Sequence, residues 1–413
     1  MAGYVRQFEE TPPVERWPLV RRWMFVEPLP FYAALRRRRG VLVTPEVTLA
    51  FGFDDCTEIL RRSDIFSVSP YKPKQGDYWM AQDDSAAHWR EKSIMRAVLD
   101  REDIPAIRNF VAEKAQSVLA AAAGGSFDAV GGLTRAVPLA LVQEWFGLAP
   151  GDPEDLKRWS YWNQMDTFWN QPFDAVAVHD PAKIVAEREA ANLAMRPFLI
   201  ALVKRRMGEI QAGQSGNDPV SRLLRLSMSQ AVRFDLPRVV LNVGGLLIGA
   251  VETTSHAVVN ALSFLMARRR NLAAARAAAR SDDPAAVDGF VFEALRFKPA
   301  FPYFFRVCEH DTVLGRGTRH ETEVAKGTMV LAVTHAAMFD PKAYANPKRF
   351  DPGRSPSNSF HFGLGLHECL GRAIGGVMIP EICRQALRLE NLKAGPVDRR
   401  GGPVPESWPW RWG

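Results

Sequence analysis

The feature that most constrains this 413-residue chain is a ten-residue run near its C-terminus, FGLGLHECLG, from Phe362 to Gly371. It places Cys369 among glycines, directly before an apolar stretch with helical spacing that extends from Leu370 to about Leu389. We expect Gly363 and Gly365 to permit backbone turns that other residues resist, and Gly371 to let another surface approach closely. Cys369 would then lie near a helix N-terminus, where unpaired N–H groups and the dipole favour a thiolate.

A single stabilised thiolate indicates an iron ligand, because haem iron takes such a ligand when the chemistry is cleavage of an O–O bond. Two alternatives stay open. Cys369 could be a small buried hydrophobic residue, as many lone cysteines are. It could also bind zinc with His361 and His367, although no second cysteine or histidine pair lies at finger-like spacing. The glycine spacing favours the iron ligand.

The run resembles the cysteine loop of the cytochrome P450 family, Phe-Gly-x-Gly-x-His-x-Cys-x-Gly. Glu293 and Arg296 fit the family's Glu-x-x-Arg helix, and the segment 347–350 fits its Pro-x-Arg-Phe motif. The resemblance extends from about Phe31 to Leu389. It implies a mainly α (α+β) cytochrome P450 fold, with a long central helix over haem and small β-sheets, and heme b (iron protoporphyrin IX) as cofactor.

Periodicity independently predicts an α-rich α+β protein. The predicted helices are 31–39, 54–62, 85–99, 104–122, 184–210, 221–227, 236–267, 272–280 and 284–297. Short strands are predicted at 41–44 and 47–51 in a small N-terminal sheet, and at 312–314, 323–324 and 329–333 in a second small sheet. Because no Ser/Gly-rich linker or internal repeat interrupts the chain, we expect residues 1–413 to form a single cytochrome P450 domain.

Charge and cysteine usage exclude several classes of protein. The net charge is +7, and the most obvious basic cluster is Arg36–Arg39. This cluster ends a predicted helix just before Gly40, where cations complement the dipole, so nucleic-acid binding is not favoured. The longest apolar run, 239–251, is too short to span a bilayer. Four cysteines without a CxxC pair or a signal peptide indicate a reducing cytoplasm.

The stretch from Gly244 to Thr254 lies in the middle of the longest predicted helix and contains three glycines. Interior glycines cost about 1 kcal/mol each relative to alanine, so we expect a flat ligand to approach the helix backbone there. Glu252 and Thr253 then offer an acid and an alcohol that can relay protons to a bound oxygen species. The alternative is a surface glutamate beside a threonine that bonds back to its own helix. The family usually has glycine where this chain has Ala250.

The resemblance implies which residues contact the haem. The cofactor-binding residues so assigned are His88, Lys92, Ala250, Arg306, Phe362, His367, Cys369 and Gly371, with Cys369 as the metal ligand and Glu252 and Thr253 as catalytic residues. His88 and Lys92 share one helical face, and Arg306 follows an aromatic strand at 301–305. Lys92 stands where the family more often has arginine, which binds carboxylates in two-pronged fashion.

Glu293 and Arg296 are predicted to pair across one helical turn, and the resemblance adds Arg349 to a Glu-Arg-Arg network beneath the cysteine loop. Met338 and Phe339 replace polar residues of the family pattern.

Two aromatic regions point to a substrate pocket. The segment 159–173 is rich in tryptophan and is interrupted by polar residues and Pro172, so it is either ordinary core or a lid over an apolar pocket. Phe301, Tyr303, Phe304 and Trp169 suggest an aromatic lining. Tyr71, Lys72 and Lys74 could meet a substrate carboxylate.

These features predict a monooxygenase that inserts one oxygen atom from O2 into a mostly apolar small molecule. No flavin, nicotinamide or iron–sulfur signature occurs in the chain, so the resemblance implies a separate ferredoxin and ferredoxin reductase. The alternative is a peroxide-dependent haem-thiolate peroxygenase or hydroperoxide isomerase, which would be expected to lack the acid–alcohol pair. A haem sensor would need an output module, and none is visible.

Overall fold

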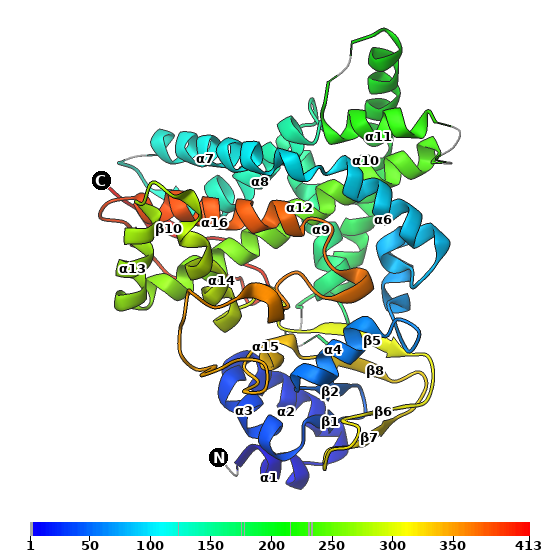
Figure 1. Ribbon diagram of the computed structural model, residues 1–413, viewed down its shortest axis with the longest axis vertical. Coiled ribbons are helices and arrows are strands. Elements are labelled where there is room, and N and C mark those ends of the chain that lie inside the picture. The colour runs from blue at the N-terminus through cyan, green and yellow to red at the C-terminus, as the bar shows by residue number, and fades with distance from the viewer. Residues whose placement is uncertain are drawn as a thin grey trace. The chain divides into compact units, whose positions relative to one another are not determined.

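The computed structural model describes residues 3–413 except 123, 175, 177, 215, 230, 231 and 233. The chain divides into two compact units, drawn in Figure 1. Unit 1 comprises Met1–Trp89, Gln171–Ala177 and Phe292–Cys369, and unit 2 comprises Arg90–Asn170, Val178–Val291 and Leu370–Gly413. The prediction of a single domain stays a prediction.

Unit 1 is built on a five-stranded sheet with strand order β1-β2-β8-β5-β3. Its strands are β1 (Val41–Val43), β2 (Thr48–Ala50), β3 (Phe66–Ser67), β5 (Phe304–Cys308) and β8 (Met329–Ala332). A separate hairpin joins β6 (Thr312–Leu314) to β7 (Thr322–Val324). The short helices of the unit are α1 (Gly3–Glu10), α2 (Pro13–Val26), α3 (Pro28–Arg38), α4 (Phe53–Arg61), α5 (Lys72–Gln75) and α15 (Thr334–Ala337).

The sheet corrects the expectation of two separate small sheets. β2 pairs in parallel with β8, with Leu49 opposite Leu331, so the N-terminal strands and the later ones form one sheet. A core of apolar side chains covers it, including Ala50, Phe66, Val330 and Ala332. The opposite face is covered as well, because Leu49 and Leu331 are also fully buried.

Unit 2 is mainly helical. Its helices are α7 (Ile104–Ala121), α8 (Ala136–Ala140), α9 (Pro153–Trp169), α10 (Pro181–Gln211), α11 (Pro219–Ser227), α12 (Leu236–Met266), α13 (Arg269–Ala279) and α16 (Arg372–Arg388). The π-helical segments η4 (Val130–Arg135) and η5 (Leu141–Trp145) flank α8. A small sheet has the order β4-β10-β9, from Phe127–Asp128, Pro409–Arg411 and Lys393–Ala394. Helices α6 (Ala86–Val98) and α14 (Asp288–Phe297) each contain residues of both units.

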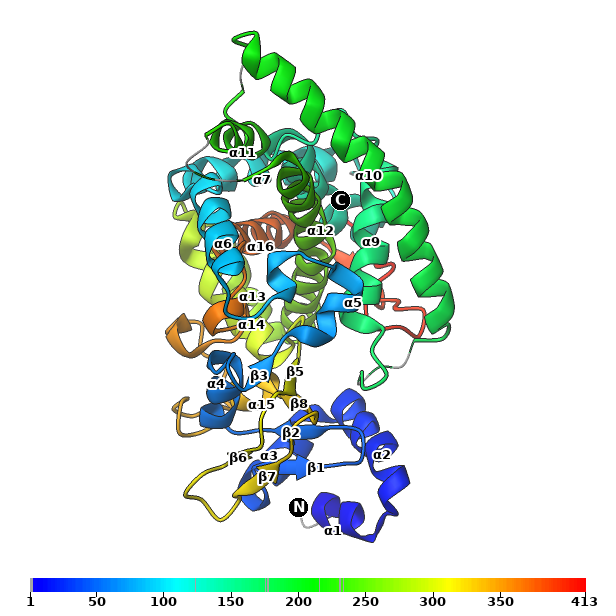
Figure 2. The same ribbon diagram turned by 90° about the vertical axis from the view of Figure 1, so that its right-hand side faces the viewer.

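Helix α12 is the central element of unit 2 and packs against α9, α10, α16 and η4 (Figure 2). It begins at the N-cap Asp235, whose carboxylate accepts a hydrogen bond from the Arg238 N–H. Within the described residues it is the one helix whose length and composition would suit a membrane span. It nevertheless buries Asn242, Glu252 and Asn260 among its apolar side chains, as the core helix of a folded protein does.

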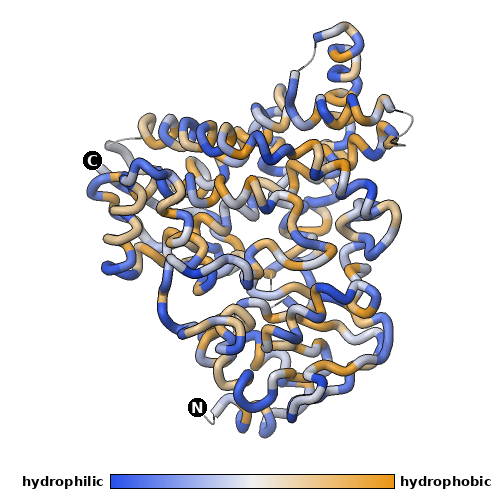
Figure 3. Tube along the Cα trace, in the orientation of Figure 1, coloured by the Kyte–Doolittle hydropathy of each residue, from blue (hydrophilic) through white to orange (hydrophobic). Residues whose placement is uncertain are grey.

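The predicted long helices are found within a few residues of their predicted ends. Hydrophobic and hydrophilic segments alternate along these helices in Figure 3, as expected where one face is buried. In the segment 159–173, residues up to Trp169 belong to α9, where Trp159, Met165 and Trp169 are buried. The first part of the segment is therefore helical, and the lid over an apolar pocket stays a prediction.

Candidate active site

The loop before Cys369 has the backbone geometry that its glycines predict. Gly363 and Gly365 have φ angles of 70° and 76°, in the left-handed region that favours glycine. A Cβ atom at Gly365 would lie 2.5 Å from the Leu60 carbonyl oxygen, so a side chain is excluded there. The Cys369 N–H donates to the Phe362 carbonyl at 2.8 Å and closes the loop. α16 begins at Arg372 with Gly371 as N-cap, so Cys369 lies two residues before a helix N-terminus.

Cys369 is the one exposed cysteine of the four, whereas Cys56, Cys308 and Cys383 are buried. Burial raises the pKa of each of those three thiols and keeps them protonated. Cys369 therefore is not a small core residue. No group of three His, Cys, Asp or Glu side chains within the described residues could hold a metal ion, which disfavours a zinc site at His361, His367 and Cys369.

Unit 1 brings together two of the predicted haem-binding histidines. The rings of His88 and His367 are edge to face, with centroids 5.1 Å apart. His88 Nδ1 lies 3.0 Å from the Trp79 carbonyl oxygen, and the Trp79 ring packs against the imidazole. Because a carbonyl only accepts hydrogen bonds, Nδ1 carries the hydrogen. These contacts fix the His88 ring beside the cysteine loop.

Arg306 is a buried cation in β5, and not a residue that follows a strand, because β5 extends from Phe304 to Cys308. Its side chain donates to the Phe305 carbonyl at 2.7 Å. No carboxylate forms an ion pair with it among the residues that the structure describes. Burial lowers the pKa of Arg306. A buried guanidinium without a carboxylate suits an anionic ligand group, which is the chemistry of a haem propionate. The residues present therefore fit haem.

The remaining predicted cofactor residues are placed as follows. Lys92 lies on α6 one turn after His88, and both side chains are buried. The Phe362 ring contacts Phe292 with centroids 6.0 Å apart. Gly371 has a φ of −80°, so its role as N-cap requires no left-handed backbone. Ala250 is half-buried on α12. None of these placements tests a contact with haem, and the assignments stay predictions.

The predicted Glu293–Arg296 pair is present and nearly solvent-free. The Arg296 guanidinium donates to both carboxylate oxygens of Glu293, at 2.7 and 2.8 Å. The expected third member is wrong: Arg349 is exposed and contributes its backbone carbonyl to Arg296. Arg354 supplies the second guanidinium, 3.6 Å from Glu293. Glu293 Oε1 also accepts a hydrogen bond from the Asp351 N–H at 3.0 Å. The ion pair thus fixes the segment that precedes the cysteine loop.

In unit 2 the acid and the alcohol lie in different surroundings. Glu252 is buried, and its Oε2 accepts from the Arg135 Nε at 3.0 Å. Burial raises the pKa of Glu252, although Arg135 opposes the shift. The Thr253 hydroxyl donates to the Gly249 carbonyl one turn earlier, at 2.7 Å. This back-bonding leaves the hydroxyl oxygen able to accept a proton or a hydrogen bond.

The glycines of α12 have different explanations. A Cβ atom at Gly244 would lie 3.1 Å from a Leu199 methyl group, so close approach of α10 accounts for this glycine. Gly249 has nothing within 4 Å of an added Cβ and is exposed. The expectation of a ligand against the helix backbone is therefore wrong for Gly244 and stays a prediction for Gly249.

Sequence reasoning missed Asp174, which is buried in unit 1. The Tyr303 hydroxyl donates to its Oδ1 at 3.0 Å, and the Gln171 N–H donates to its Oδ2 at 2.6 Å. Beside it the Phe173 ring contacts Phe305, and Phe305 stacks on Tyr71 at 4.3 Å. Tyr71 is therefore buried in an aromatic stack, and its contact with a substrate carboxylate stays a prediction. Asp174 lies in the connection between α9 and α10, where no helical or strand periodicity could predict that its side chain is buried.

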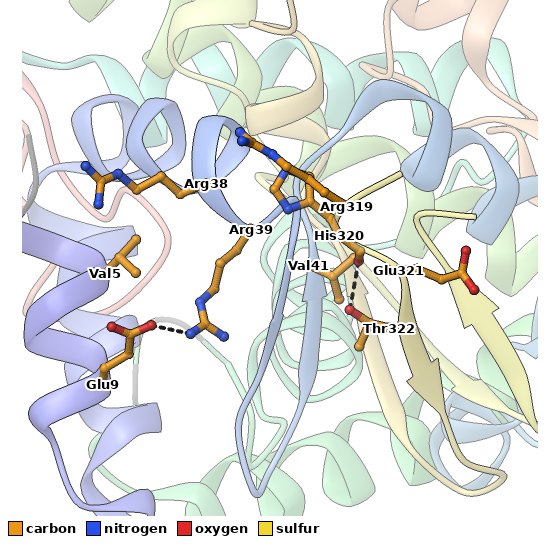
Figure 4. Close-up of a pocket in the computed structure, with 9 residues that line it drawn as sticks. All are labelled: Val5, Glu9, Arg38, Arg39, Val41, Arg319, His320, Glu321 and Thr322. Carbon is orange, nitrogen blue, oxygen red and sulfur yellow. Dashed lines mark hydrogen bonds and ion pairs between the residues drawn. The ribbon is translucent and has the colours of Figure 1, made fainter. Parts of the chain in front are cut away.

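A pocket of about 630 Å³ opens at the N-terminal edge of unit 1 (Figure 4). Arg38, Arg39, Arg319 and His320 line it, and Arg39 pairs with Glu9. This is where two of the four clustered arginines lie. None of its lining residues belongs to the cysteine loop, so we do not assign the oxidation chemistry to it.

Comparison with known proteins identifies the class. A family model described as Cytochrome P450 matches residues 33–396. The chain belongs to the cytochrome P450 family.

Two relatives are the Erythromycin C-12 hydroxylase of Saccharopolyspora erythraea and the Cytochrome P450 monooxygenase PikC of Streptomyces venezuelae. The first is 29% identical over 78% of this chain and 76% of the relative, and the second 26% identical over 87% and 83%. The structure of Cytochrome P450 CYP109Q5 from Chondromyces apiculatus matches with a TM-score of 0.76 at 21% identity, covering 94% of this chain and 96% of that one. The predicted fold is thereby confirmed, and the chain is a haem-dependent monooxygenase with heme b as its cofactor.

Proposed function

We propose that this chain holds heme b through Cys369 and inserts one oxygen atom into a mostly apolar small molecule, with electrons from a ferredoxin and its reductase. The observation that carries the proposal is the exposed Cys369 thiol in a glycine loop that ends at a helix N-terminus. When bound, the haem supplies reduction of O2 and cleavage of its O–O bond at a thiolate-ligated iron. We place the protein in the cytoplasm and treat residues 1–413 as one domain.

The side chains have distinct roles. The Arg306 guanidinium, with His88, Lys92 and His367, holds the haem carboxylates, since a buried cation such as Arg306 binds anions strongly. Thr253 offers a partly exposed hydroxyl, and Glu252 a buried carboxyl whose pKa is raised. A protonated acid beside an alcohol can hold and pass on a proton. The aromatic side chains of Phe301 and Phe304, which stack with centroids 6.4 Å apart, suit an apolar substrate.

The experiment compares two sources of oxidising equivalents. The purified holoenzyme is supplied with NADH, a ferredoxin and a reductase under isotopically labelled O2, or with hydrogen peroxide alone. We expect labelled product in the first case and little in the second. Thr253→Ala should keep NADH consumption but divert electrons to peroxide, because ordered proton delivery is lost. Turnover with peroxide alone that equals the NADH-supported rate would instead indicate the peroxygenase.

A further inference from the structure

Two carboxylates of unit 2 share one guanidinium. Arg135 ends η4 and lies 2.9 Å from Glu252 Oε2 of α12 through its terminal nitrogen. The same nitrogen lies 3.4 Å from Glu406 Oε2, in the C-terminal segment before β10. It also donates to the Pro405 carbonyl at 3.2 Å. Three segments far apart in the sequence therefore meet at Arg135.

Tyr161 of α9 completes the cluster. Its hydroxyl donates to Glu406 Oε1 at 2.7 Å, and the Arg135 guanidinium lies over its ring at 5.3 Å. Both carboxylates are thus held on the guanidinium by contacts that leave little freedom to Arg135. Such fixed geometry is expected of a positioning element and not of a mobile surface ion pair.

The charges of this cluster do not balance. Arginine stays protonated in proteins, so two carboxylates against one guanidinium leave an excess negative charge. The Glu252 side chain is 6% exposed and that of Glu406 is 15% exposed, so water screens this charge poorly. Lys157 of α9 is the other cation that acts on Glu252, and Tyr161 is neutral. Burial raises the pKa of Glu252, and the Glu406 charge acts in the same direction, so both favour the protonated form of Glu252.

The hydrogen-bond partners of Glu252 and Glu406 indicate which of the two side chains can carry a proton that is free to transfer. Both Arg135 contacts to Glu252 fall on Oε2, whereas Oε1 is buried and has no hydrogen-bond partner within the described part of the chain. Glu406 uses Oε1 for Tyr161 and Oε2 for Arg135. A proton on Glu252 Oε1 therefore disturbs no hydrogen bond. A proton on either oxygen of Glu406 would disturb the hydrogen bond from Tyr161 or from Arg135.

We propose that Arg135 and Glu406 are positioning residues for Glu252: the guanidinium fixes Oε2, and the Glu406 charge keeps a proton on Oε1. The inference rests on the proposed role of Glu252 as proton donor. In each transfer the Glu252 carboxyl loses one proton and becomes a carboxylate. It then regains a proton from solvent, and Arg135 stays protonated throughout and transfers no proton.

The first test measures protonation of Glu252 directly. Infrared titration of the holoenzyme follows the carbonyl stretch of a protonated carboxyl, and Glu252→Gln identifies the band by its loss. Glu406→Gln should lower the midpoint pH and Arg135→Gln should raise it, each by at least about 0.5 pH unit, because the charge that acts on Glu252 changes in opposite senses. Arg135→Lys should restore part of the shift and stands in if Arg135→Gln fails to fold. Glu144→Gln, at a half-exposed pair with Lys114, is the control and should leave the midpoint unchanged.

The second test measures peroxide released per NADH consumed as a function of pH. We expect Glu406→Gln to shift the pH at which coupling is lost in the same direction as the infrared midpoint. Midpoints that do not move, while Glu252→Gln uncouples the enzyme, would overturn the positioning roles alone. Unchanged coupling in Glu252→Gln would overturn the proposed function of Glu252 itself.

Discussion

The imidazole of His88, on α6, lies edge to face against that of His367, in the cysteine loop, with ring centroids 5.1 Å apart. Each ring thus limits the movement of the other, and Trp79 supports His88 from a second side at 5.2 Å. The contact joins two residues that the family resemblance assigned to haem binding. It lies wholly within unit 1.

We predict that His367→Leu weakens haem retention, because it removes both a hydrogen-bonding ring and the support of His88. The rate of haem transfer to a haem-free acceptor protein should rise several-fold, corresponding to about 1 kcal/mol per hydrogen bond lost. His310→Leu, at an exposed histidine of the same unit, is the matched control. Equal transfer rates in both variants and the parent would show that His367 does not hold the haem.

Arg306→Met should affect the haem-free and haem-bound protein in opposite directions. Without haem the variant loses a buried cation that no carboxylate offsets, so its stability should be unchanged or higher. Haem affinity should fall at least tenfold, or about 1.4 kcal/mol, because a charge-assisted contact is lost. Thermal unfolding without haem and haem titration measure the two effects. Arg196→Met, at an exposed position of α10, is the control, and a lower stability without haem accompanied by normal affinity would contradict the account.

Asp174 gives a pH dependence of defined sign. Burial raises the pKa of Asp174 from 3.8 to about 7. The folded state therefore binds more protons than the unfolded state between these values, so stability decreases as pH rises from about 4 to 7. Asp174→Asn keeps an acceptor for the Tyr303 hydroxyl and should remove this part of the slope. Denaturant unfolding from pH 5 to 7.5 compares the two proteins, and parallel curves would show that Asp174 does not titrate in this range.

Docking of the electron donor should depend on surface charge. Arg96 on α6 and Arg372 at the start of α16 are both exposed, whereas Lys92 of α6 is buried and cannot contribute to such a surface. Charge reversal at Arg96 or Arg372 should slow reduction by an acidic ferredoxin at low salt with little effect on substrate affinity. Stopped-flow reduction at two ionic strengths measures this, with Arg196→Glu as control. Rates insensitive to salt and to both reversals would place the docking surface elsewhere.

The sequence predicted local structure better than pairing between distant segments. Helices such as α7 and α12 follow from apolar periodicity, because one face of each is buried. The parallel pairing of β2 with β8 could not be predicted, since both strands are short and nothing local in either encodes a distant partner. The aromatic strand was placed at 301–305, whereas β5 occupies Phe304–Cys308. Strand ends of this kind depend on the neighbouring strand.

The candidate site shows the same division. The turns at Gly363 and Gly365 follow from residue type, and Glu293 with Arg296 follows from helical spacing. The replacement of Arg349 by Arg354 does not, because either guanidinium could reach the helix from the same loop and only its path decides. The contacts of Arg135 with Glu252 and with Glu406 could not be predicted either, because they join three segments that share no sequence motif.

The most direct test of the central claim is the spectrum of the reduced carbon monoxide complex of Cys369→Ser. A hydroxyl is a poor substitute for an anionic sulfur donor, so we predict that the variant folds, retains some haem and loses the Soret position characteristic of thiolate ligation. Cys383→Ser, at a buried cysteine of α16, is the control and should keep the parent spectrum. An unchanged thiolate spectrum in Cys369→Ser would contradict the assignment of Cys369 as the iron ligand.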